Sequence, residues 1–127
     1  MPRSDSNQDE QPVATTSVRK LADHMTCSRA AELFRALGEP SRLQILATLL
    51  QGECSVSELA QQLQDSVSSV SQRLKTLRTE RIVNCRREGK KMIYFLADEQ
   101  LGEMVARMFE HVVKPVPGME IGRIWMN

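Results

Sequence analysis

The side chains best suited to bind a charged partner lie between Ser66 and Phe95. Eight of the ten charged residues in this segment are basic, which gives it a local net charge of +6 in a chain whose net charge is +1. The basic residues are Arg73, Lys75, Arg78, Arg81, Arg86, Arg87, Lys90 and Lys91. Cations concentrated in this way attract phosphate groups, so the pattern predicts a nucleic-acid-binding surface. The alternative is an ordinary solvated basic face, which a run of charges alone would also fit.

The segment after Ser66 has the periodicity of an amphipathic helix. Its apolar residues, expected to face the core, are Val67, Val70, Leu74 and Leu77. The residues predicted to contact DNA from this helix are Ser68, Ser69, Ser71, Gln72, Arg73 and Lys75. Small serine side chains allow close approach to the major groove, and glutamine can pair with adenine as arginine does with guanine. Lys75 and Arg78 lie farther back along the helix and should meet phosphates.

Two short β-rich segments, residues 82–87 and 92–96, are predicted to form a hairpin. Glu88-Gly89-Lys90 between them supplies the glycine that a tight turn needs. The hairpin would offer four further cations to the DNA backbone or the minor groove. These are Arg86, Arg87, Lys90 and Lys91.

Three cysteines, an odd number without a Cys-x-x-Cys pair, argue against a disulfide scaffold. Cys54 precedes a predicted helix start, where it either packs as a hydrophobic staple against Leu59 or has a pKa lowered by the helix N-terminus. Cys27 follows His24 by three residues, a spacing that suits a soft metal on a continuous helix, although a small residue at a helix junction is the simpler interpretation. Cys85 is expected to pack inward from its strand.

The length of 127 residues leaves room for one domain, and the patterns predict a mainly α fold with a small β-hairpin. Residues 1–12 are expected to be a disordered tail, residues 13–114 the folded domain, and residues 115–127 a C-terminal tail. Within the domain, helices are expected at 13–25, 28–38, 40–51, 55–63, 66–78 and 98–114. Ser55-Val-Ser-Glu58 fits a helix capping box, and Asp98 can cap the last helix.

Four sequence blocks together resemble the ArsR/SmtB family of bacterial winged-helix repressors. The blocks are Glu39-Pro-Ser-Arg-Leu-Gln-Ile-Leu46, Ser55-Val-Ser-Glu-Leu-Ala60, Val70-Ser-Gln-Arg-Leu-Lys-Thr-Leu77 and Gly89-Lys-Lys-Met-Ile-Tyr-Phe-Leu96. The resemblance covers residues 28–112 and implies a winged helix-turn-helix that forms a homodimer through its first and last helices. It also implies binding to an inverted-repeat operator in double-stranded DNA, and release by an effector that is often a metal ion or metalloid. Glu39 departs from the family pattern, in which Asp usually precedes the proline. Glu is expected to cap the following helix less well than Asp.

The effector sites that the resemblance implies are both altered in this chain. On the last helix the matching positions are Asp98, Gln100, His111 and Lys114, so two of four ligand types remain. Asp98 would instead be an N-cap, and His111 an exposed or interfacial residue. The second family site is a thiolate pair, for which this chain has Ser55 and Ser57.

The remaining thiols therefore become the expected sensing groups, with His24 nearby. Cys27 and Cys54 are the better candidates, ahead of Cys85. The expected effector is a soft metal ion or arsenite. Oxidation or reactive-sulfur modification of the same thiols is the alternative, and a hairpin-and-helix module that docks another protein is the alternative of a different class.

Enzyme activity is not expected, because the chain has two histidines, no nucleophile elbow, no glycine-rich phosphate loop and no convincing carboxylate pair. No run approaches 18 apolar residues, so no membrane span is expected. The N-terminus is polar and acidic and does not resemble a secretory signal, which favours a cytoplasmic protein.

Overall fold

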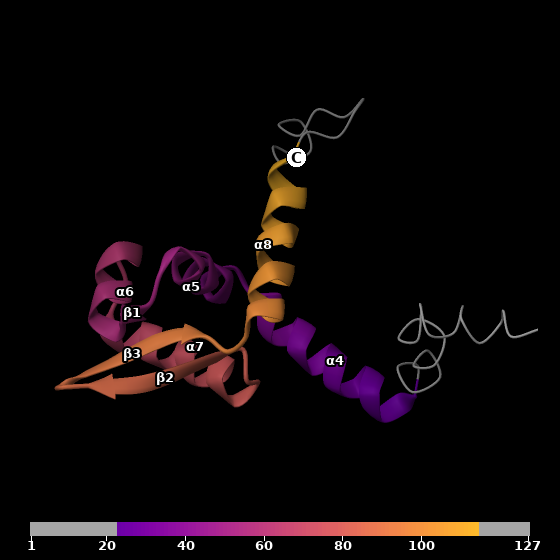
Figure 1. The fold of residues 1–127 in the computed structure, drawn as a ribbon, viewed down its shortest axis with the longest axis horizontal. Coiled ribbons are helices and arrows are strands. Elements are labelled where there is room, and N and C mark those ends of the chain that lie inside the picture. The colour runs from indigo at the N-terminus through magenta and orange to yellow at the C-terminus, as the bar shows by residue number, and fades with distance from the viewer. Residues whose placement is uncertain (1–22, 115–127) are drawn as a thin grey trace, which may run out of the picture. The chain divides into compact units, whose positions relative to one another are not determined.

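The computed structural model describes residues 23–114, and the chain divides into two compact units, Met1–Leu37 and Gly38–Asn127. In the first unit, helix α4 (His24–Leu37) begins directly after Asp23 (Figure 1). The Asp23 carboxylate accepts hydrogen bonds from the backbone N–H groups of Met25 (2.6 Å) and Thr26 (3.3 Å). A carboxylate that satisfies these otherwise unpaired N–H groups starts a helix.

The expected break between residues 25 and 28 is therefore wrong, because α4 runs through this stretch without interruption. No glycine or proline interrupts it, and Asp23 sets its start. Leu37 ends the helix immediately before Gly38, as predicted. Most of the helix expected at 13–25 lies outside the described residues, as do both predicted tails.

The second unit contains four helices and three strands among its described residues. They are α5 (Pro40–Gln51), β1 (Cys54–Ser55), α6 (Val56–Leu63), α7 (Val67–Thr79), β2 (Val83–Glu88), β3 (Lys91–Leu96) and α8 (Glu99–Val113). Side chains cap each helix at its start. Glu39 accepts from the N–H of Arg42 at 3.0 Å, so Glu works as a cap here despite its extra methylene. At α6 both bonds of the predicted capping box are present.

The core of this unit is formed by one face of each helix and the start of β2. Its fully buried side chains are Ile45, Leu46, Leu59, Val70, Leu74, Leu77, Ile82, Val83 and Val105. The prediction for α7 is confirmed at three of its four apolar positions. It is wrong at Val67, which is 51% exposed because it lies in the first turn, ahead of the part of α7 that packs on the core.

The sheet is antiparallel with the order β1-β3-β2, so the predicted hairpin has a third strand that was not expected. Tyr94 on β3 lies opposite Cys54 on one side and Cys85 on the other. Gly89 makes the turn with a φ of +64°, a conformation that favours glycine. The hairpin extends away from α8 (Figure 1). Within residues 23–114, no helix is both long enough and apolar enough to cross a membrane.

Candidate nucleic-acid interface

The turn between α6 and α7 fixes the direction in which α7 leaves. Gln64 closes α6 in the left-handed conformation, with a φ of +54°. Ser66 then caps α7 by accepting a hydrogen bond from the N–H of Ser69 at 3.0 Å, as the sequence predicted. Because the buried face of α7 is held on the core, its opposite face is directed to solvent.

The exposed face of α7 includes four of the six predicted DNA-contacting residues. They are Ser68, Ser71, Gln72 and Lys75. The other two, Ser69 and Arg73, are half-buried at the side of the helix. No acidic residue occurs anywhere in α7, so nothing on the helix itself would repel a phosphate backbone.

Arg73 is held by an ion pair with Asp65 in the preceding turn. The same carboxylate accepts a hydrogen bond from the N–H of Ser66 at 2.7 Å. The Arg73 guanidinium, followed by the Ser66 N–H, holds the pKa of Asp65 below its usual value. Arg73 therefore braces the turn in this structure, and a DNA base would have to compete with Asp65 for it.

Arg86 is similarly engaged on the hairpin. Its guanidinium lies 2.7 Å from a carboxylate oxygen of Glu53 and 2.7 Å from one of Glu88. It also lies 5.5 Å from the centre of the Phe95 ring, a cation–π distance. The hydrogen bonds that Arg86 donates to Glu53 and then to Glu88 raise the pKa of Arg86. The structure thus uses Arg86 to join β2 to the residue that precedes β1.

The tip of the hairpin carries the other predicted cations. Arg87, Lys90 and Lys91 are all exposed, around the turn at Gly89. Glu53 and Asp65, which hold Arg86 and Arg73, were not identified from the sequence. Their only sequence signal was an acidic residue near a turn, which is common at protein surfaces.

A pocket of about 310 Å³ lies between α7 and β3. It is lined by Ser71, Lys75, Arg78, Thr79 and Tyr94. Burial raises the pKa of Tyr94, the neighbouring Cys85 thiol raises it further, and Arg78 opposes both effects. Sequence reasoning missed Tyr94, because a tyrosine in a strand is far more often part of the packing than of a binding site.

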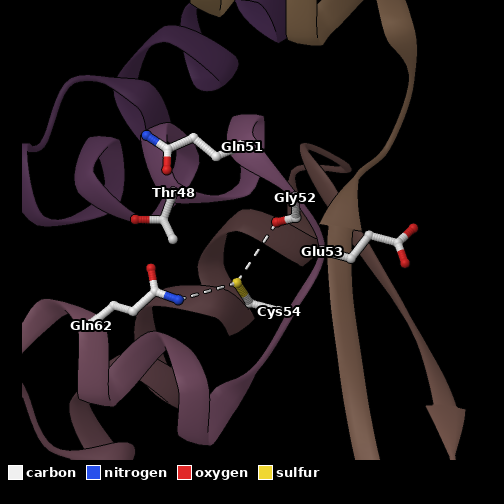
Figure 2. A pocket seen from close by; sticks show the side chains of 6 residues that line it. All are labelled: Thr48, Gln51, Gly52, Glu53, Cys54 and Gln62. Carbon is white, nitrogen blue, oxygen red and sulfur yellow. Dashed lines mark hydrogen bonds between the residues drawn. The ribbon is translucent and has the colours of Figure 1, made fainter.

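A second pocket, of about 260 Å³, contains the Cys54 thiol. Figure 2 shows Cys54 directed toward the Gly52 carbonyl and the Gln62 amide, while Glu53 points to the other side of the strand. The Cys54 Sγ donates to the Gly52 oxygen at 3.7 Å and accepts from Gln62 Nε2 at 4.0 Å. The wall is completed by Thr48 and Gln51.

The pKa of Cys54 is raised, chiefly by burial and then by the charge of Glu58, with the Gln62 hydrogen bond opposing both. The lowered pKa that was one interpretation of this position is therefore wrong. A helix N-terminus favours a thiolate, but a buried sulfur beside a carboxylate pays more in desolvation and repulsion than it gains. The alternative of a packed side chain agrees with its place in β1.

The other candidate effector residues lie on separate elements. Cys27 is exposed on α4, where His24 Nε2 lies 3.5 Å from Ser28 Oγ. Cys85 is half-buried on β2. Asp98 is the N-cap of α8, accepting from the N–H of Leu101 at 2.7 Å, and His111 is exposed in the last turn of that helix.

Within residues 23–114, no three histidine, cysteine or acidic side chains gather closely enough to hold a metal ion. The side chains of this part of the chain thus do not form a complete metal site, whose usual minimum is three protein ligands.

Comparison with known proteins assigns the chain to a family. The model described as "Bacterial regulatory protein, arsR family" matches residues 39–84, which include the α6–turn–α7 motif. A biofilm growth-associated repressor from Agrobacterium fabrum is 33% identical over 100 residues, which are 79% of this chain and 86% of that protein. This chain belongs to the ArsR family.

A further relative and a solved structure agree with this assignment. A transcriptional repressor SmtB homolog from Synechocystis is 38% identical over 82 residues, 65% of this chain. That match spans 62% of the relative's length, less than two thirds. The homodimeric winged helix-turn-helix DNA-binding domain of Mb0332 from Mycobacterium bovis is 27% identical, with a TM-score of 0.70 over 76% of this chain and 89% of that domain. The predicted winged helix-turn-helix is confirmed, and the family consists of regulators rather than enzymes.

Proposed function

We propose that this ArsR-family protein is a transcriptional repressor that binds double-stranded DNA. The observation that carries the proposal is the exposed face of α7, which presents hydroxyl, amide and cationic groups without a single carboxylate in the helix. Beside it, the hairpin tip adds Arg87, Lys90 and Lys91. This distribution suits a helix in the major groove and a hairpin along the backbone or in the minor groove.

The exposed residues of α7 and those of the hairpin make different kinds of contact with DNA. Ser68, Ser71 and Gln72 can approach base edges, with Gln72 able to form a paired contact to adenine. Arg73 can add a guanine contact if the base displaces Asp65. The cations of the hairpin tip supply contacts that are independent of sequence and sensitive to salt.

We infer that the binding unit is a homodimer paired in part through α8. Met104, Met108 and Val112 recur along this helix and are 38%, 36% and 49% exposed. Apolar side chains in one stripe favour association with a second copy. A two-fold dimer presents two copies of α7, so the operator should be an inverted repeat.

We propose that a change at cysteine thiols releases the protein from DNA. A soft metal ion or a metalloid such as arsenite is the first candidate effector, because thiolates prefer such ions. Because the described part of one subunit does not group three ligands, coordination would need donors from a second subunit or from outside residues 23–114. Covalent modification of a thiol is the second candidate, and the exposure of Cys27 favours it because modification needs a single accessible sulfur.

DNA binding is tested with an operator selected from a pool of random duplexes by the full-length protein. We expect selection of an inverted repeat and binding that weakens steeply with salt. Failure to bind any duplex at low salt would contradict the proposal and favour a module that docks another protein.

The effector is tested on the selected complex with arsenite, zinc, copper and a persulfide donor. Cys27→Ser and Cys54→Ser should retain operator affinity, and at least one of them should lose the response, whereas His111→Ala should respond as the wild type does. If a variant without any cysteine still dissociates fully with the effector that releases the wild type, the thiol proposal is wrong. An effector site at Asp98 and His111, or an organic effector, would then need testing.

A further inference from the structure

The pocket between α7 and β3 has the chemistry of an anion site. Lys75 and Arg78 contribute two cations, and Ser71, Thr79 and Tyr94 contribute hydroxyl groups. No carboxylate lines it. Phosphate and sulfate groups are bound by this combination of positive charge and hydrogen-bond donors.

The position of the pocket restricts which anion it can bind. Ser71, Lys75 and Arg78 are separated by four and three residues along α7, so they share one side of the helix. That side adjoins the exposed residues Ser68 and Gln72, which face the bases in the proposed complex. A helix lying in the major groove is flanked by the sugar–phosphate backbone, so the pocket would lie beside a backbone phosphate.

The wall formed by β3 distinguishes the pocket from a simple basic helix face. Tyr94 is half-buried and lines the pocket together with Arg78. Both Arg78 and the Cys85 thiol lie close enough to the phenol to shift its pKa. The phenol and the guanidinium therefore face the same pocket. Thr79, by contrast, donates its hydroxyl to the Lys75 carbonyl at 2.9 Å and can only accept while that bond lasts. The donors available to an anion are then Ser71, Lys75, Arg78 and Tyr94.

We propose that this pocket holds a phosphodiester group of the DNA backbone, with Tyr94 and Arg78 as ligands on its two sides. The inference rests on the proposed DNA-binding function and adds a particular contact to it. The contact is independent of base sequence and fixes the position of α7 relative to the DNA strand. Arg78 supplies the charge, and Tyr94 supplies a directed hydrogen bond.

The test compares the binding of full-length variants to a random-sequence duplex over a range of salt concentrations. Arg78→Gln should lower the slope of log affinity against log salt by about one per bound subunit, since one phosphate contact is lost. Tyr94→Phe should weaken binding roughly two- to tenfold without changing the slope, because a neutral hydroxyl displaces no counterion. Arg29→Gln removes the same charge from an exposed position on α4, outside the basic segment and the pocket, and should leave the slope unchanged.

A second arm separates backbone phosphate from free phosphate. Inorganic phosphate should displace the duplex no better than chloride at equal ionic strength. Selective displacement by low concentrations of phosphate would show a site for free phosphate and overturn the assignment.

Thermal unfolding of each variant checks that the fold is kept, and Tyr94→Phe retains the ring that packs. If the wild type binds duplex with a steep salt slope but Arg78→Gln and Arg29→Gln behave alike, the pocket assignment fails and the proposed function stands. If the wild type binds no duplex, both fail.

Discussion

Two arginines on the candidate interface are already paired with carboxylates before any DNA arrives. Asp65 holds Arg73, and Glu53 with Glu88 holds Arg86. Exposed ion pairs of this kind contribute little to stability, but they orient long side chains and reduce their effective charge. These three ion pairs therefore matter more to how the surface binds DNA than to whether the protein folds.

We predict that Arg73→Ala weakens binding to the selected operator more than binding to random duplex. A lost base contact should cost about 1–3 kcal/mol on the operator. Asp65→Asn should act in the opposite way on random duplex, because it releases the charge of Arg73 while an amide oxygen can still accept from the Ser66 N–H. We expect tighter random-duplex binding and a steeper salt slope for Asp65→Asn, measured by fluorescence anisotropy.

The double variant is the control for this pair. If Arg73 mediates the effect of Asp65, then Asp65→Asn should change nothing in a protein that already carries Arg73→Ala. Equal losses on operator and random duplex for Arg73→Ala alone would exclude a base contact.

We predict that Cys54 reacts slowly with iodoacetamide at neutral pH. Its raised pKa keeps the sulfur protonated, and the thiolate is the reactive form. The labelling rate of Cys54 should rise only at a pH above the range in which an ordinary cysteine ionises. Mass spectrometry of peptides over a time course measures the labelling of each cysteine.

Exposed Cys27 should be labelled before Cys54 in the same sample. Gln62→Leu removes the hydrogen bond that opposes the raised pKa and should slow Cys54 further. Rapid labelling of Cys54 at neutral pH in the folded protein would contradict the assignment.

At the scale of elements, local signals were predictable and long-range pairings were not. The capping box at Ser55 and the glycine turn at Gly89 depend on residues only a few positions apart, so the local sequence is enough to predict them. Strand β1 has two residues and no periodicity of its own, and its partner is β3, far along the chain. The Glu53–Arg86 pair joins residues 33 positions apart, which only the assembled sheet brings together.

The same distinction applies to the candidate site. Outward-facing residues of α7 followed from helical periodicity, and Ser68, Ser71, Gln72 and Lys75 are exposed as that periodicity requires. Tyr94 enters the α7 pocket through the register of the sheet, which the sequence does not specify. The unbroken α4 was not predicted, because its start depends on the cap at Asp23 and the apolar pattern around residues 23–28 is weak.

We predict that the capping box stabilises α6 and that this contribution depends on pH. Ser55→Ala should lower the free energy of unfolding by about 0.5–2 kcal/mol, the usual effect of losing an N-cap. Glu58 accepts from the Ser55 N–H at 2.8 Å, and this bond, with the Ser55 side chain, lowers the pKa of Glu58. Because the pKa is lower in the folded state, the Glu58 contribution is complete above the unfolded pKa and is lost as the pH falls through the folded value.

Urea unfolding between neutral pH and pH about 3 tests this sign, since an unfolded glutamate titrates near pH 4.3. Glu58→Gln can keep the hydrogen bond but not the titration. The stability difference between the wild type and Glu58→Gln should therefore shrink as the solution becomes acidic. A difference that grows in acid would contradict the lowered pKa.

At the scale of the whole molecule, charge is divided between one basic segment and an acidic remainder. The +6 of residues 66–95 in a chain of +1 leaves a net charge of −5 elsewhere. A nearly neutral protein of this kind has little general attraction to polyanions, but its basic segment is attracted strongly and in one orientation. The acidic remainder would discourage DNA from binding any other face.

We predict that the wild type is a dimer at micromolar concentration and that Met104→Glu dissociates it. A carboxylate in the apolar stripe of α8 would have to be buried without a partner in a two-fold interface. Analytical ultracentrifugation measures the mass of both proteins. Glu103→Gln changes a neighbouring exposed position and should leave the dimer intact.

The dimer also sets the spacing of its operator. Half-sites recognised by two symmetry-related copies of α7 should lie about one or two helical turns apart. Met104→Glu should consequently lose affinity for the full inverted repeat far more than for an isolated half-site. A monomeric wild type at micromolar concentration would overturn this account.

Tyr94 is the only tyrosine in the chain, and Trp125 is the only tryptophan. A Trp125→Phe protein would therefore have Tyr94 as its one strongly fluorescent side chain, placed in the α7–β3 pocket. Nucleic-acid bases emit very weakly, so the fluorescence of this ring can be followed near neutral pH while DNA is bound. A hydrogen bond from the phenol to a phosphate oxygen would change that emission. The protein thus carries a native optical reporter, and the occupancy of the pocket can be observed without an attached label.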